Sequence, residues 1–413
     1  MDLTYADADV RFRERVRGFL AERLPAGWTG WGALDRDEYD AFAADWRRVL
    51  VDQGWLAPAW PVEYGGGGLS VAEQSILAEE LVRAGAPASP LPNDAYGVGL
   101  LGPTLLSWGT AEQREYFLPR TVSGEIRWAQ GYSEPEAGSD LFGLRTTAVR
   151  DGDEWVLRGE KVWQSEGMTA NWIFVLARTD PDAPKAKGLS FLLVPIDQPG
   201  VRRSPIRNMA GREDFSGFVI DGARTAASNL VGGVHNGAKV ALTLLGYERG
   251  AGGVATAAAY EIELRRLVEL VRHRGLADDP LVRDRLARCY TKVQILRHLG
   301  LRALSAGISG NPPGPESSIL KLYGAEYHNE VTELALDVLG PAGLAPTGEP
   351  ASNTLGADPL GSDPLSASSW STVAMLARAA TIYGGSSQIQ RSTIAEQILG
   401  LPREPRVAVP AKR

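Results

Sequence analysis

The residue pattern changes twice along the chain, and these changes restrict the fold more than any other feature. Apolar residues at helical spacing dominate the first 120 or so residues and return after Asn236. Between them lie short runs of β-branched and aromatic residues. At 413 residues the chain is long enough for two or three subdomains. We predict an α+β protein with an N-terminal α-helical domain at 1–124, a middle antiparallel β barrel or sandwich at 125–235, and a C-terminal α-helical domain resembling a four-helix bundle at 236–413.

The expected helices follow from apolar periodicity and from start and stop signals. Ser70-Val-Ala-Glu73 is a capping box that opens a helix, and Gly400-Leu-Pro402 ends the last one. The predicted helices cover 7–23, 39–53, 71–83, 94–108, 110–123, 238–274, 280–306, 317–339 and 387–399. The segment Pro341–Ser368 is rich in Gly, Pro and Ser and is typical of an irregular insertion.

A hairpin signal marks the middle of the chain. Asp151-Gly152 separates two runs with strand-like composition, Thr146–Val149 and Glu154–Trp163. Further short strands are predicted at 172–177, 189–196 and 218–220. Because no crossover helices lie between these runs, the strands are expected to pair antiparallel.

Charge and composition exclude several classes of function. A formal net charge of −7 argues against a nucleic-acid surface or a basic membrane-binding face. No run approaches the roughly 18 apolar residues that a membrane span needs, and the acidic N-terminus does not resemble a signal peptide. Cys289 is the single cysteine, which excludes an intrachain disulfide and fits a reducing cytoplasm. The four histidines stand singly, so no metal site is expected.

The segment Trp128–Leu141 is the first candidate ligand site. It carries the hydroxyls of Tyr132, Ser133 and Ser139 and ends on Gly-Ser-Asp, just before the hairpin. Hydroxyls together with backbone N–H groups suit a planar heteroaromatic ring and a nearby phosphate. An ordinary polar turn is the alternative.

A second candidate follows at the end of the predicted hairpin. In Lys161-Val-Trp-Gln-Ser165, an indole is followed two residues later by a hydroxyl. Trp163 can cover a flavin while Ser165 bonds its edge. A place in the core is the alternative for Trp163.

A third candidate is the glycine-rich helix around Glu248. Gly246, Gly250 and Gly253 recur at i, i+4 and i+7, and each costs the helix about 0.5–1 kcal/mol relative to alanine. Something therefore approaches this face closely, either a ligand or a neighbouring helix. Burial raises the pKa of a carboxylate, which suits a general base working near neutral pH. Because Arg249 is adjacent and can pair with an acid, Glu248 alone is ambiguous.

Six motifs stand in order along the chain. They are Tyr-Ser-Glu-Pro-Glu-Ala-Gly-Ser-Asp at 132–140, Gly-Glu-Lys-Val-Trp-Gln-Ser at 159–165, Asn-Leu-Val-Gly at 229–232, Gly-Tyr-Glu-Arg at 246–249, Leu-Asp-Val-Leu-Gly-Pro-Ala-Gly at 336–343 and Ile-Tyr-Gly-Gly-Ser-Ser-Gln-Ile-Gln-Arg-Ser-Thr-Ile-Ala-Glu at 382–396. In this order and spacing the chain resembles the acyl-CoA dehydrogenase family from about residue 5 to 404. The family's architecture is also α, then β, then α.

The resemblance implies non-covalently bound FAD between the β domain and the C-terminal bundle. The cofactor contacts implied by position are Tyr132, Ser133, Trp163 and Ser165 around the isoalloxazine, Ser139 near phosphates of the cofactor or the thioester carrier, and Gly340, Ser386 and Gln388, some of them across a subunit boundary. Substrate contacts are expected from Ser139, Tyr247 and Arg249. The implied assembly is a homotetramer or homodimer, or a mixed oligomer. An electron-transfer flavoprotein or a similar acceptor is the implied partner.

The implied reaction removes the α proton of an acyl thioester while a hydride leaves the β carbon for flavin N5. Many members carry their catalytic glutamate directly after the tyrosine of the last motif, where this chain has Gly384. A second group, including isovaleryl-CoA dehydrogenase, carries it at the position matching Glu248. The resemblance therefore implies Glu248 as the base, with the Gly384 N–H and a flavin hydroxyl polarising the thioester oxygen.

Two other functions fit the same resemblance. A flavin monooxygenase on this fold needs no base at this position, so Glu248 argues against it. A non-catalytic partner subunit of a mixed oligomer is opposed by Glu248 and by the intact flavin motifs. The family's arginine motif is degraded to Arg272-His-Arg-Gly275, which leaves the arginine for the FAD pyrophosphate unassigned. The acyl chain, and whether CoA or a carrier protein holds it, also stay open.

Overall fold

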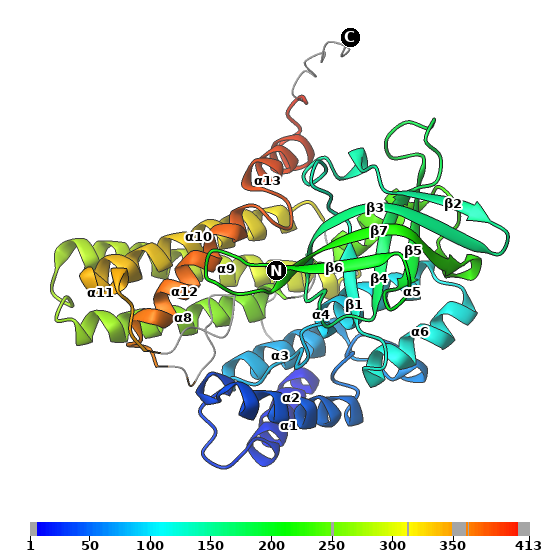
Figure 1. The fold of residues 1–413 in the computed structure, drawn as a ribbon. Coiled ribbons are helices and arrows are strands. Elements are labelled where there is room, and N and C mark those ends of the chain that lie inside the picture. The colour runs from blue at the N-terminus through cyan, green and yellow to red at the C-terminus, as the bar shows by residue number, and fades with distance from the viewer. Residues whose placement is uncertain (1–5, 249–251, 312–313, 349–360, 362, 404–413) are drawn as a thin grey trace, which may run out of the picture.

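The chain folds into N-terminal helices, a middle β-sheet and a long C-terminal helical bundle (Figure 1). The computed structural model describes residues 6–248, 252–311, 314–348, 361 and 363–403. The predicted α, β, α order is confirmed. The proposed boundaries at 124/125 and 235/236 fall in connections, since one helix ends at Ser123 and another begins at Gly237.

Six described helices form the N-terminal part. They are α1 Asp7–Arg23, α2 Arg36–Asp52, α3 Val71–Arg83, α4 Asp94–Tyr96, α5 Gly102–Trp108 and α6 Ala111–Ser123. Three of them, α2, α3 and α6, begin at side-chain caps. The predicted Ser70–Glu73 capping box is present at α3. A second box, between Asp35 and Glu38, starts α2 earlier than the apolar spacing indicated. A π-helical turn at Gly97–Leu101 joins α4 to α5 within the predicted helix.

Eight strands form one sheet in the middle of the chain. They are β1 Trp128–Gly131, β2 Thr147–Asp151, β3 Glu154–Ser165, β4 Trp172–Arg178, β5 Leu189–Pro195, β6 Val201–Ile206, β7 Phe215–Ala226 and β8 Leu230–Val231. Their order is β6-β7-β3-β2-β4-β5-β8, and β1 pairs with β4. The hairpin between β2 and β3 is confirmed, with Gly152 at φ +58°. Most pairs are antiparallel, but β1 and β2 each pair with β4 in parallel.

Strands that are not hydrogen-bonded neighbours in the sheet share one core on its inner face. Trp155 of β3, Ile173 of β4 and Phe218 of β7 belong to the same buried cluster. The alternate residues of β4, Phe174 and Leu176, face a second cluster that includes residues of the N-terminal helices and α7. Both faces of β4 are therefore buried, and the second cluster joins all three parts of the chain.

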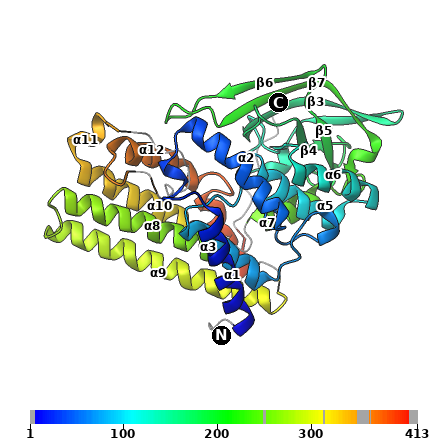
Figure 2. The same cartoon turned by 90° about the horizontal axis from the view of Figure 1, so that it is seen from below.

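The C-terminal part consists mainly of long helices running side by side (Figure 2). They are α7 Gly237–Glu248, α8 Gly253–His273, α9 Pro280–Ile308, α10 Ser317–Leu339, α11 Pro341–Leu344, α12 Ala367–Ala377 and α13 Ser387–Thr393. Helices α8, α9, α10 and α12 share one apolar core, as expected for a bundle. The predicted helix 238–274 corresponds to α7 and α8, and residues 249–251 between them lie outside the described residues. The predicted insertion contains α11, while 349–360 and 362 lie outside the description.

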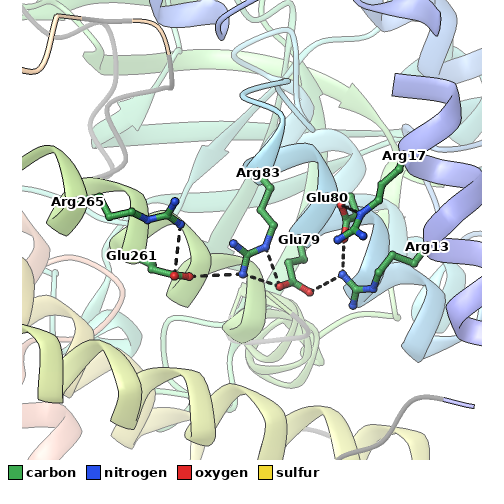
Figure 3. A network of polar contacts seen from close by, with 7 residues as sticks. All are labelled: Arg13, Arg17, Glu79, Glu80, Arg83, Glu261 and Arg265. Atoms are coloured by element: carbon green, nitrogen blue, oxygen red, sulfur yellow. Dashed lines mark hydrogen bonds and ion pairs between the residues drawn. The ribbon is translucent and has the colours of Figure 1, made fainter. Parts of the chain in front are cut away.

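A network of seven charged residues joins the N-terminal helices to the bundle (Figure 3). Glu79 of α3 contacts Arg13 of α1 at 3.0 Å and Arg83 at 2.9 Å. Arg83 reaches Glu261 of α8 at 3.5 Å. The remaining contacts are Arg13–Glu80, Arg17–Glu80 and Arg265–Glu261.

Among the described helices, none is long and apolar enough to cross a membrane.

Candidate active site

Strand β1 and the start of the segment after it are held in the core, while Pro135, Glu136 and residues 138–140 are exposed. Trp128 is fully buried and its indole N–H donates to Thr121 Oγ1 at 2.9 Å. The ring of Tyr132 is buried edge-on against Phe174 and Phe191. Any contact of Tyr132 with a ligand must therefore come from its backbone.

Glu134 closes a tight turn and anchors the start of β2. Its backbone exchanges two hydrogen bonds with Ala137, of 3.1 and 3.0 Å. Its carboxylate accepts the backbone N–H groups of Arg145 at 2.7 Å and Thr146 at 2.8 Å. Burial would raise the pKa of Glu134, but the charge of Lys161 and these hydrogen bonds lower it. Glu134 is therefore a carboxylate with fixed donors, not a surface acid.

Lys161 of β3 lies beneath this turn and is fully buried. Its ammonium donates to the Tyr132 carbonyl at 3.0 Å, to Glu134 Oε1 at 2.9 Å and to the Leu176 carbonyl at 2.9 Å. Burial lowers the pKa of Lys161 to about 8, and the attraction of Glu134 opposes that shift. The motif containing Lys161 was noted from the sequence, but its role was missed. The signal was the alternation in β3, where Trp155, Leu157 and Lys161 share the inward face.

The end of β3 turns Trp163 out of the core. Pairing with β7 shifts register between Lys161 and Gln164, and Trp163 has a φ of +68°. Such a backbone is rare for an aromatic residue and is found at functional sites. The bulge buries Gln164 and leaves Trp163 58% exposed, its ring edge-on to Phe215. Since the indole is exposed, a place in the core is excluded for Trp163.

Two of the predicted flavin segments lie next to each other. The Val162 N–H donates to the Ser133 carbonyl at 2.9 Å, which brings Ser133 beside the strand that carries Trp163 and Ser165. Ser133 and Ser165 are both half-buried. Two hydroxyl-bearing residues therefore flank an exposed indole on one rigid sheet.

Two predicted site residues of the C-terminal part, Gly384 and Ser386, lie at a double-glycine turn. Gly384 and Gly385 have φ values of +62° and +90°, which L side chains rarely adopt. Gln390 donates to the Gly384 carbonyl at 3.0 Å, and Lys321 donates to the Gly385 carbonyl at 2.9 Å. Ser386 caps α13 by accepting the Ile389 N–H. The turn is thus held in place by two side chains and a helix cap.

The structure describes only part of the glycine-rich helix. Glu248 is the last residue of α7, but its side chain lies outside the description, as do Arg249 and Gly250. Tyr247 bonds Ser107 Oγ at 2.7 Å through its hydroxyl. A Cβ on Gly253 would lie 3.0 Å from the Cα of Gly300, whereas Gly246 faces open space. The helix-contact interpretation therefore holds for Gly253, while Gly246 leaves room for a ligand.

The remaining predicted contacts are spread over the molecule. Ser139 and Gln388 are exposed, Ser139 beside the Asp140–Lys185 ion pair and Gln388 on α13. Gly340 ends α10 with φ +56° and leads into α11. Both views place α11 at the far end of the bundle from the sheet (Figures 1 and 2). Gly340 therefore does not lie near the predicted cofactor residues of the β domain in the same chain.

Within the described ranges, no group of three or more His, Cys, Asp or Glu could hold a metal ion.

Comparisons with known proteins cover nearly the whole chain. Three family models match: the acyl-CoA dehydrogenase N-terminal domain at 7–125, the middle domain at 129–223 and the C-terminal domain at 235–399. The chain is 42% identical over 399 residues to acyl-CoA dehydrogenase IpdE1 of Mycobacterium tuberculosis, covering 95% of this chain and 98% of that protein. A solved structure titled Tcur3481-Tcur3483 steroid ACAD superposes with a TM-score of 0.79 at 34% identity, covering 98% of this chain and 100% of that one. The ChsE4-ChsE5 complex from Mycobacterium tuberculosis gives 0.76 at 30% identity, with 98% and 100% coverage.

Proposed function

The chain belongs to the acyl-CoA dehydrogenase family, whose members are oxidoreductases acting on CH–CH bonds, and from that premise we propose that it dehydrogenates an acyl thioester between its α and β carbons with FAD as cofactor. The observation that carries the proposal is the bulge at the end of β3. An exposed indole is held there in a left-handed backbone conformation beside Ser133 and Ser165. A planar cofactor with a polar edge fits this arrangement.

FAD fits the chemistry of the residues present. We propose that the backbone of Tyr132, the hydroxyls of Ser133 and Ser165 and the face of Trp163 hold the isoalloxazine ring. Ser139, Ser386 and Gln388 are proposed contacts for other polar parts of the cofactor, and Ser139 also for the thioester carrier. When bound, FAD supplies the acceptor for the hydride that leaves the β carbon of the substrate.

Glu248 is the proposed base that removes the α proton. The position after Tyr383 is Gly384, which has no side chain and cannot titrate. The Gly384 N–H is proposed to polarise the thioester oxygen, which makes the α proton more acidic. The turn at Gly384 is suited to this because Gln390 and Lys321 hold its carbonyls. Tyr247 and Arg249 are proposed to contact the substrate.

We further propose that the cofactor site is completed by a neighbouring chain. The remote position of α11 supports this, because Gly340 cannot join the β-domain residues of its own chain (Figure 1). A homotetramer or homodimer supplies that neighbour. The similarity to a structure titled as the ChsE4-ChsE5 complex supports a mixed oligomer as the second possibility. Sedimentation of the purified chain, alone and with co-expressed relatives, distinguishes the two.

The physiological setting is also a proposal. The electron acceptor is proposed to be an electron-transfer flavoprotein or a similar protein, and the buried free thiol of Cys289 supports a cytoplasmic location. The thioester is carried by CoA or by a carrier protein.

The test is the colour of the protein and its response to substrate. We expect a yellow protein with one FAD per chain that bleaches without oxygen when the right thioester is added. The panel contains straight, branched and ring-bearing acyl-CoA thioesters and their carrier-protein counterparts. A folded preparation, tested alone and with its relatives, that takes up no FAD contradicts the proposal.

A further inference from the structure

Lys161 is the one lysine among the described residues that is buried, and its surroundings match its three donors. Its acceptors are two carbonyls and one carboxylate, each within 3.0 Å. An ammonium has three donors and no acceptor, so the group is fully satisfied. Its burial has a cost, because an ammonium taken out of water loses its hydration, and the attraction of its partners must offset that loss.

The acceptors come from the segment after β1 and from β4. Tyr132 and Glu134 follow β1, and Leu176 belongs to β4, with which β1 pairs in parallel. The Val162–Ser133 hydrogen bond lies next to this group. Lys161 therefore ties the segment carrying Tyr132 and Ser133 to the strand that carries Trp163 two residues later.

An apolar side chain of similar length would fill the same space without the cost of burying a charge. Replacing a buried ion pair by apolar groups is often neutral or stabilising. A methionine could not bind two carbonyls and a carboxylate at one point, however. What the ammonium adds beyond packing is a fixed distance between the two segments.

We propose that Lys161 is a positioning residue for the FAD site: by binding Tyr132 O and Glu134 at one ammonium, it fixes the Tyr132–Ser133 and Trp163–Ser165 segments at the separation that the cofactor ring requires. This role rests on the proposed function. Glu134 takes part by accepting the N–H groups of Arg145 and Thr146, which extends the same frame to the start of β2.

The test measures FAD affinity and the spectrum of the bound flavin, not activity. The double variant Lys161→Met with Glu134→Gln removes both charges and keeps the volume. We expect FAD to bind about 10- to 100-fold more weakly, because binding must then order two segments that the ammonium no longer holds in place, with a shifted visible spectrum. The matched control is Glu263→Gln, which changes one member of the buried Glu263–His328 pair of the bundle, 3.2 Å apart. The control should bind FAD like the parent.

The outcomes separate the two proposals. A parent that takes up no FAD contradicts the proposed function and this role with it. A parent that binds FAD, and a folded double variant with the same affinity and spectrum, contradict only the role of Lys161. If the double variant does not fold, Glu134→Gln alone keeps an acceptor for Lys161 and is titrated instead. It should bind FAD at least about threefold more weakly, and parent-like affinity and spectrum overturn the role.

Discussion

The two regions that carry the proposed site are built in different ways. In the β domain, Lys161 and Glu134 are buried and bonded on every side, and they hold the segments around Trp163. In the C-terminal region, Glu248 ends a helix, and Gly384 lies on a turn where Gln390 donates a hydrogen bond to the Gly384 carbonyl. We propose that the first region provides a rigid frame and that the second provides the reacting groups. A change in the frame should therefore cost stability and cofactor binding, and a change in the second region should cost rate.

The largest expected effect tests the reacting groups. Glu248→Gln keeps shape and hydrogen-bonding capacity but removes the base. Flavin reduction by the substrate should fall by about 10²–10⁴-fold or more, because a positioned base contributes about that much, while FAD content stays that of the parent. Anaerobic stopped-flow absorbance measures the rate. A variant that reduces its flavin as fast as the parent would show that the base lies elsewhere.

A double variant sharpens this assignment. Glu248→Gly with Gly384→Glu moves the carboxylate to the position that many family members use. Part of the lost rate should return, since both positions are proposed to approach the same α carbon. Gly384→Glu alone is the control, and it should not exceed the parent.

The next effect tests the frame. Glu134→Ala leaves a fully buried ammonium without its counter-charge and two backbone N–H groups without an acceptor. We expect the free energy of unfolding to fall by about 3–5 kcal/mol, measured by urea denaturation. The control lies two residues away: Glu136→Ala removes an exposed pair with Arg145 and should cost about 0–1 kcal/mol. Equal losses for the two variants would contradict the role of Glu134 in the frame.

Local sequence signals were enough for the order of elements but not for every contact. The capping box at Ser70 and the turn at Gly152 act over a few residues, so both were predicted. Strand β6 was missed because Val201–Ile206 carries two arginines and a proline on an edge strand. The two parallel pairings of β4, with β1 and β2, join residues far apart in the chain, and no local pattern encodes them.

The candidate site also has features that local sequence patterns predict and features that they do not. Trp163 and Ser165 were predicted as site residues because their motif is contiguous, and they stay a prediction. The left-handed backbone that exposes the indole depends on the register shift against β7. The partners of Lys161 lie 29, 27 and 15 residues away in sequence. The alternation in β3 indicates that Lys161 faces inward, but only the tertiary structure identifies its partners.

A smaller effect tests the double-glycine turn. In Gly385→Ala, the new Cβ would lie 2.5 Å from Gln390 Nε2, at a φ of +90°. We expect a loss of about 1–2 kcal/mol of stability from the left-handed backbone alone. Flavin reduction should slow less than in Glu248→Gln, because the neighbouring N–H is displaced but not removed. Gly18→Ala is the control, since it lies in α1 with open space around it, and it should not destabilise. A Gly385→Ala protein as stable as the parent would show that the turn tolerates other backbone conformations.

The smallest expected effect comes from the network that joins α3 to α1 and α8 (Figure 3). Burial would raise the pKa of Glu79, but the hydrogen bond from Arg83 and the charge of Arg13 hold it below its ordinary value of 4.5. A carboxylate with a lowered folded pKa stabilises the protein fully above its unfolded pKa, and this contribution is lost as the pH falls through the folded pKa. Glu79→Gln should therefore cost about 1 kcal/mol at pH 7, and the difference from the parent should shrink below pH 4.5.

Urea denaturation of both proteins between pH 7 and the acid limit of folding measures this difference. Glu63→Gln, on the exposed turn Val62–Tyr64, is the control and should leave the pH dependence unchanged. FAD affinity at pH 7 should be that of the parent in both variants, because the network joins helices and touches none of the proposed cofactor residues. A Glu79→Gln protein whose deficit is constant with pH would show that Glu79 acts through packing. One that loses FAD would show that the helix junction and the β-domain frame are coupled, against the division of roles drawn above.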